Sequence, residues 1–167
     1  MYKFIVLPII VIFFSACSGA ISTPSISPNF ATTKQFDKSV MVVADGVPQS
    51  KLQTPFVQPL VLENSIIDTI RRSRLFSLVT NTNPDVVIQV FVVYTDIPLF
   101  AGEFNSEVEI AWIVKKDNKI VYKRSFITTA IQSKDSFAGI TRAASAISEA
   151  TKKNIELALE DISRLNL

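Results

Sequence analysis

The feature that most constrains the fold is a long apolar stripe near the C-terminus. Small or apolar residues recur there every three or four positions, at Ile140, Ala144, Ile147, Thr151, Ile155, Ala158, Ile162 and Leu165. This spacing places them on one face of a helix over about residues 138 to 164. At about 1.5 Å per residue the helix would be about 40 Å long, enough to lie across a small sheet. Glu149 with Lys153 and Glu160 with Arg164 would pair on its exposed side. We expect the stripe to cover a sheet; the alternative is that it recruits a partner helix.

The preceding residues alternate strand signals with one further helix. The sequence predicts a strand over 39–44, a helix over about 60–76, a short edge strand over 77–80, a strand over 85–95, a strand over 103–115 and a hairpin strand over 120–130. The 85–95 stretch is apolar on both faces, which is typical of a central strand covered on both sides. The 103–115 stretch alternates between apolar and polar residues, which predicts a strand with one face exposed to solvent. We therefore expect an α+β fold, with a single mostly antiparallel sheet of four to five strands packed by one shorter helix and the long C-terminal helix.

The first 16 residues have the organisation of a secretory signal. One positive charge, Lys3, precedes an apolar run from 4 to 14. A helix that spans a bilayer needs about 20 apolar residues, and this run is shorter. We expect residues 1–16 to be a cleaved signal peptide.

Cys17 is the only cysteine in 167 residues and lies where the apolar run ends. With Phe14, Ser15 and Ala16 before it, it resembles the bacterial lipoprotein signal, although that signal usually has Leu where Phe14 stands. The resemblance implies that Cys17 is lipidated and anchors the protein to a membrane; the alternatives are an ordinary signal peptide or an uncleaved anchor. Ser18 is not the Asp that retains such proteins at the inner membrane of enteric-type bacteria, which favours the periplasmic face of the outer membrane.

The mature chain divides into a tether and one domain. Residues 17–36 are rich in Ser, Thr and Pro and predict a disordered tether that could span several tens of Å. Residues 37–167 predict a single α+β domain. Within this domain the proline-containing stretch 47–59 predicts a long irregular connection of unknown role.

Composition excludes several classes of function. Removing the signal peptide leaves 17 minus 1, that is 16, basic residues against 15 acidic ones. The mature chain therefore lacks the positive electrostatic field that suits binding of nucleic acid. The chain has no histidine, and a lipidated Cys17 leaves no thiol for a metal site or a disulfide. No nucleotide or cofactor motif is present. Glu103, Glu107 and Glu109 could form a carboxylate pair, but on a wet strand face they are better explained as solvated. We expect no enzymatic activity, metal or cofactor.

Three groups of residues are candidates for contact with a partner. Leu99 and Phe100 are large apolar residues between two predicted strands, where they either contact a partner or plug the end of the core. Arg71, Arg72 and Arg74 either bind an anion or a lipid headgroup, or complement the dipole of their helix. The hairpin carries five basic residues that either meet anionic lipid or cell-wall polymer, or pair with Glu107 and Glu109 across the strands: Lys115, Lys116, Lys119, Lys123 and Arg124.

Residues 66–76, which end in Ser73-Arg74-Leu75-Phe76, followed by the strand at 85–90, carry a resemblance to a family. This order resembles small bacterial envelope lipoproteins: the transport-auxiliary lipoproteins of lipid-transport systems, the penicillin-binding-protein activators, and the N-terminal domain of the Tol propeller protein. The resemblance implies a non-enzymatic adaptor that docks on an envelope transport or assembly complex. The alternative is a carrier that holds a lipid or cell-wall ligand between the sheet and the long helix.

Overall fold

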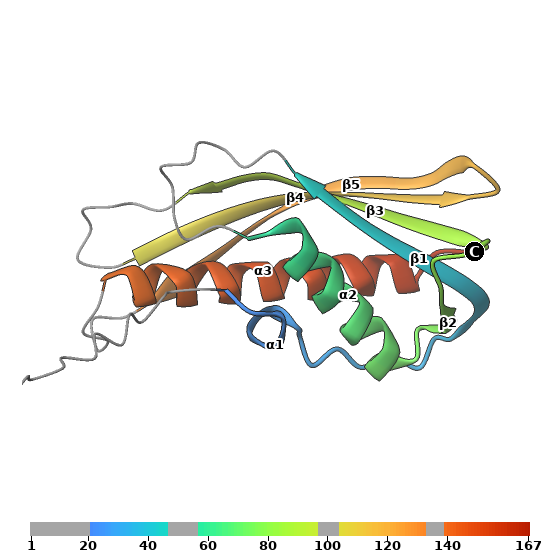
Figure 1. Ribbon diagram of the computed structural model, residues 1–167, viewed down its shortest axis with the longest axis horizontal. Coiled ribbons are helices and arrows are strands. Elements are labelled where there is room, and N and C mark those ends of the chain that lie inside the picture. Colours follow the sequence, from blue (N-terminus) through green and yellow to red (C-terminus); the bar gives the residue numbers. More distant parts are fainter. Residues whose placement is uncertain (1–20, 47–56, 97–103, 133–138) are drawn as a thin grey trace, which may run out of the picture.

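The computed structural model describes residues 21–46, 57–96, 104–132 and 139–167. A five-stranded sheet with the order β2-β1-β3-β4-β5 packs on a layer of helices. In Figure 1 the sheet lies above and the helices below. The elements in chain order are α1 (Thr23–Ile26), β1 (Phe36–Gly46), α2 (Pro59–Ser73), β2 (Phe76–Val79), β3 (Val86–Asp96), β4 (Phe104–Lys116), β5 (Lys119–Gln132) and α3 (Gly139–Ser163).

The sheet is mixed, because β1 pairs parallel with both of its neighbours. Val40 on β1 lies opposite Val86 on β3, while β3 with β4 and β4 with β5 are antiparallel. β2 is a four-residue strand at the edge of the sheet, as the sequence predicts. The predicted α+β class, with one shorter and one long helix, is confirmed.

The prediction that β3 is covered on both faces is wrong. Val86, Ile88 and Val90 are fully buried towards the helices, whereas Val93 is 40% exposed and Phe91 is half-buried. All the described helices lie on one side of the sheet, so no described helix covers the other side (Figure 1). The outward side chains of β3 are shielded only in part, by neighbouring strands on either side. An apolar run alone does not distinguish this from burial under a second layer.

The long C-terminal helix is confirmed. α3 runs Gly139–Ser163 and fully buries Ile147, Ile155 and Ile162 of the predicted stripe. Glu160 pairs with Arg164 as expected. Glu149 lies 3.6 Å from Lys152, one position earlier than the predicted partner.

The β4–β5 hairpin is confirmed together with its turn. Asp117 and Asn118 have φ of 50° and 60°, as required by the primed turns whose twist matches that of paired strands. On β4, Val108, Ile110 and Trp112 are fully buried, so the predicted alternation of the two faces holds.

The predicted tether differs from the sequence expectation from Ile21 onward. Ile26 is fully buried, Pro28 is buried, and Ile21 and Phe30 pack against the core. The short helix α1 packs between α2 and α3. Residues 21–35 are therefore laid across the helical layer as part of the domain. The high content of serine and proline predicted a solvated chain, because the few apolar residues of this segment do not recur with the period of a helix or a strand.

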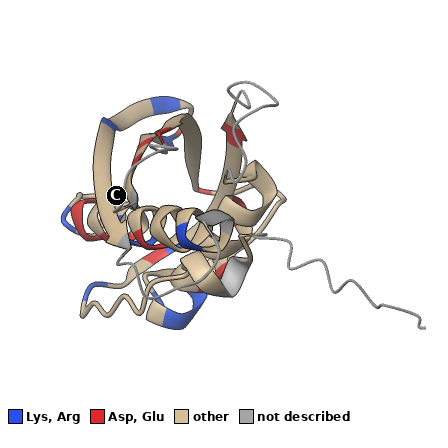
Figure 2. Ribbon diagram, turned by 90° about the vertical axis from the view of Figure 1, so that its left-hand side faces the viewer, with Lys and Arg blue, Asp and Glu red and all other residues tan. Residues whose placement is uncertain are grey.

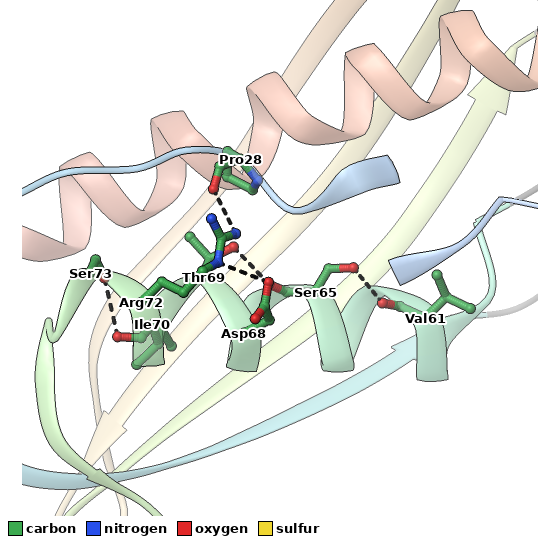
Figure 3. A network of polar contacts seen from close by, with 8 residues as sticks. All are labelled: Pro28, Val61, Ser65, Asp68, Thr69, Ile70, Arg72 and Ser73. Atoms are coloured by element: carbon green, nitrogen blue, oxygen red, sulfur yellow. Dashed lines mark hydrogen bonds and ion pairs between the residues drawn. The ribbon is translucent and has the colours of Figure 1, made fainter. Parts of the chain in front are cut away.

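A polar network on α2 holds this N-terminal segment in place. The Arg72 guanidinium pairs with Asp68 at 3.0 Å through Nε and donates from Nη2 to the Pro28 carbonyl at 3.0 Å. Figure 3 shows Arg72 reaching from α2 to the segment that passes over α3. At the C-terminal end of this segment the Phe36 N–H donates to the Leu75 carbonyl at 2.8 Å.

Among the described residues, no helix combines the length and apolar character needed to cross a bilayer.

Candidate functional site

The side of the sheet that faces away from the helices is the candidate site, and we call it the open face. Its apolar members come from four strands: Met41, Val43, Val87, Phe91, Ala111, Ile113, Ile127 and Ile131. The register places some of them side by side, since Met41 lies opposite Val87 and Phe91 opposite Ala111, whereas Ile127 lies opposite Glu109 and Ile131 opposite Asn105. Ile127 is 58% and Ile131 64% exposed. Large apolar side chains gathered on one exposed face mark contact with a partner more often than scattered exposed residues do.

Hydroxyl and carboxylate groups lie on the same face beside the apolar residues. Tyr94 donates to Glu107, and this hydrogen bond raises the pKa of Tyr94 to about 12. Ser125 donates to Glu109 at 2.5 Å. The predicted pairing of these carboxylates with the hairpin lysines is replaced by hydroxyl contacts. Both glutamates therefore accept hydrogen bonds from neutral hydroxyl groups. This arrangement is typical of carboxylates with a structural role.

A second polar cluster ties β5 to the last turns of α3. Tyr122 donates to the Asp161 carboxylate at 2.8 Å, and Arg124 pairs with the same oxygen at 2.7 Å. Arg124 also lies 4.7 Å from the centroid of the Phe126 ring. The hydrogen bond from Tyr122, with the charge of Arg124, lowers the pKa of Asp161, while burial raises the pKa of Tyr122. The cluster fixes the end of α3 against the sheet.

This cluster predicts a loss of stability in acid. A carboxyl whose pKa is lowered by folding stabilises the native state above its unfolded pKa of about 3.9, and that stability is lost as pH falls through the folded value. Asp161→Asn should lower the free energy of unfolding at pH 7 by about 1 kcal/mol and flatten its decline below about pH 4. Urea unfolding across pH measures both effects. Glu160→Gln, at the neighbouring position, serves as control, and an equal change in that variant would contradict the assignment.

The space between the sheet and the middle of α3 is filled by side chains. Trp112, fully buried, donates to Asn154 Oδ1 at 3.0 Å, and Asn154 Nδ2 donates to the Phe126 carbonyl at 2.7 Å. The Thr128 hydroxyl donates to the Ala150 carbonyl at 2.7 Å. β4, β5 and α3 thus meet directly here. This part of the interface offers no support for the carrier alternative.

The three arginines near the end of α2 do not form one site. Arg71 and Arg74 line a shallow depression of about 430 Å³ beside β2, together with Gln35, Phe76, Ser77, Leu78 and Val79. Arg72 points instead to Asp68 and Pro28. Figure 2 shows basic and acidic residues interspersed along the chain. Within the described ranges no group of acidic, histidine or cysteine side chains could hold a metal ion.

Two of the residue groups predicted as sites lie outside the described ranges. They are Phe14, Ser15, Ala16 and Cys17 in the leader region, and Leu99 and Phe100 between β3 and β4. Asp96 and Phe104, which flank the latter pair, lie at the end of the sheet where β1 and β5 also end. Lipidation at Cys17 and partner contact at Leu99 and Phe100 stay predictions.

The open face was not identified by sequence reasoning. Its signal was present in the second apolar face of residues 85–95, which was assigned to burial. β4 carried part of the same signal, because Ala111 and Ile113 are apolar residues on the face of that strand that was expected to be polar. A strand that is apolar on both faces in a chain with only two substantial helices could have indicated an uncovered surface.

Comparison with known proteins shows the fold. No family model matches the chain, and no curated protein matches it in sequence. Protein XCC0632 from Xanthomonas campestris, of the DUF330 family, matches in structure with a TM-score of 0.60 at 15% identity, over 80% of this chain and 88% of that one. The hypothetical protein CT253 from Chlamydia trachomatis matches with a TM-score of 0.59 at 8% identity, over 77% and 96%.

A third structural match is PelC from Paraburkholderia phytofirmans, which was solved as a dodecamer. Its TM-score is 0.51 at 13% identity, over 80% of this chain and 91% of that one. Chains described as lipoproteins, from Caulobacter crescentus and Neisseria meningitidis, also match, with TM-scores of 0.45 and 0.46; we base no argument on them. At these identities the likeness concerns the fold. The predicted resemblance to transport-auxiliary lipoproteins and to the Tol propeller protein stays a prediction.

Proposed function

We propose that this chain is a lipid-anchored protein of the bacterial envelope and acts as a non-enzymatic adaptor. Its domain presents the open face to a protein partner in an envelope transport or assembly complex. The observation that carries the proposal is the group of apolar side chains on the open face of β1, β3, β4 and β5, on which none of the described helices packs.

The anchor part of the proposal rests on Cys17. One acyl chain gives only marginal membrane binding, whereas two or more hold a protein stably. A diacylglyceryl thioether with a further acyl chain on the amino group would therefore make the attachment effectively permanent. Ser18 after the cysteine favours the periplasmic face of the outer membrane.

The adaptor part rests on the chemistry of the open face. Apolar side chains in its middle, such as Phe91 and Ile113, are half-buried, and Ile127 and Ile131 project at one edge. Tyr94 and Ser125 hold carboxylates of the same face in defined positions. An apolar centre with ordered polar groups beside it is the anatomy of protein interfaces. The absence of histidine and of a free thiol is why we propose binding in place of catalysis.

Site-specific crosslinking tests the adaptor proposal. A photoreactive residue in place of Ile127, on the open face, should capture a defined envelope protein in intact cells. The same residue at Leu60, 66% exposed on α2, should not. Ile127→Asp should reduce recovery of this partner from detergent-solubilised membranes by about tenfold or more, and Leu60→Asp should leave recovery unchanged.

Two results would overturn the adaptor proposal. One is recovery of the monomer alone, without a crosslink at Ile127. The other is equal loss of the partner in both aspartate variants, which would place the contact elsewhere. Circular dichroism of both variants verifies that the fold is retained, as expected for substitutions at exposed positions.

A further inference from the structure

The stretch that would connect the lipid to the domain is much shorter than its composition predicts. Ile21 already packs against the core, and Ile26 and Pro28 are buried. The Ser25 and Ser148 hydroxyls lie 3.5 Å apart, which places this segment beside the first half of α3. Arg72 holds the segment again at the Pro28 carbonyl. The chain therefore packs as part of the domain from Ile21 onward at the latest, not from near residue 37.

The length of the remaining chain limits how far the domain can move from the bilayer. If Cys17 carries the lipid, as the proposed function holds, only four residue steps separate it from Ile21. A fully extended chain spans at most about 3.5 Å per residue, so the reach is about 14 Å. A tether from Cys17 to Phe36 would reach about 65 Å when extended and would allow every orientation.

This reach is smaller than the thickness of the domain. A helix is about 10 Å across and a sheet with its side chains adds about 10 Å, so the two layers measure about 20 Å. Ile21 directly precedes α1, which contacts α2 and α3 on the helical side. To lay the open face flat on the bilayer, the chain before Ile21 would have to pass both layers, which about 14 Å does not allow.

We infer that the lipid anchor holds the helical layer towards the bilayer surface and directs the open face of the sheet away from the lipid. The helical side of the domain thus contacts a phospholipid surface. The exposed positions of α2 suit this surface, because Leu60 and Asn64 lie on its outer side and Arg71 is exposed at its end. Arginine near a bilayer is attracted to anionic headgroups. A partner of the open face then approaches from the aqueous side.

Fluorescence quenching from labelled lipids tests the orientation. The full chain, processed in bacteria, is reconstituted into vesicles of phosphatidylethanolamine and phosphatidylglycerol that contain a lipid with a nitroxide on its headgroup. Lipidation consumes the only native thiol, so single-cysteine variants label at one site. A fluorophore at Asn29→Cys or Asn64→Cys should be quenched several-fold more strongly than one at Lys123→Cys or Ile127→Cys, on the open face.

A longer linker supplies the matched control. Inserting about 15 Gly and Ser residues after Gly19 keeps the lipidation signal but should abolish the difference between the two sides. Equal quenching on both sides of the native-length protein, or stronger quenching on the open face, would overturn the inference while leaving the anchor intact. Mass spectrometry of the same samples separates the two claims, because a native chain without acyl groups would refute the anchor, and the orientation with it.

Discussion

Cys17→Ala is expected to abolish lipid attachment completely. Radiolabelled palmitate should enter the wild-type chain and not the variant, because the thiol is the only site for the thioether in the sequence. The variant should also retain its leader, since the processing that the lipoprotein signal implies follows lipidation. Each buried methylene contributes about 0.8 kcal/mol, so the loss of two or more acyl chains removes far more affinity than any surface contact of the domain supplies.

Two further variants control the Cys17 experiment. Ser18→Ala should keep both the label and the cleavage, whereas Ser18→Asp should keep the label and shift the protein from the outer to the inner membrane fraction. A wild-type chain that is cleaved without label would show that the leader is an ordinary secretory signal. Palmitate in Cys17→Ala would show that the lipid is attached at a site other than Cys17.

Asn154→Ala is expected to be the most destabilising single truncation of a polar side chain. Asn154 is fully buried, accepts from Trp112 and donates to the Phe126 carbonyl. Its removal leaves the indole N–H and a main-chain carbonyl unpaired inside the protein, at about 1 to 3 kcal/mol each. We expect a loss of about 3 kcal/mol and a Tm lower by about 10 °C.

Thermal unfolding followed by the fluorescence of Trp112, the only tryptophan, measures the effect of Asn154→Ala. Asn64→Ala is the matched control, because Asn64 is exposed on α2 and its truncation should change stability by less than about 0.5 kcal/mol. A Tm of Asn154→Ala within a degree or two of wild type would contradict the network.

Sequence periodicity was sufficient to predict the elements in which apolar residues recur at regular intervals. The stripe of α3 and the alternation of β4 each correspond to one buried face, and both were confirmed. The hairpin was predicted from Asp117 and Asn118, residues that adopt a positive φ at low cost. These features depend on local geometry alone.

The features that were not predicted depend on residues far apart in the chain. Asn154 looks like an ordinary polar residue of a helix until Trp112, 42 residues earlier, is placed opposite it. Ile26 and Pro28 have no periodic neighbours and become part of the core only because Arg72 and α3 provide a surface for them. The open face required knowledge that both α2 and α3 pack on the same side of the sheet.

The parallel pairing of β1 also determines the order in which the chain can fold. Phe36 pairs with Phe76 and Val40 with Val86, so both partners of the first strand are synthesised some forty residues later. A chain that emerges N-terminus first therefore exposes both edges of β1 until β2 and β3 have followed. Such non-local pairing slows folding and leaves strand edges open to other chains. If the proposed leader directs export, this interval is when a holding chaperone would be needed most.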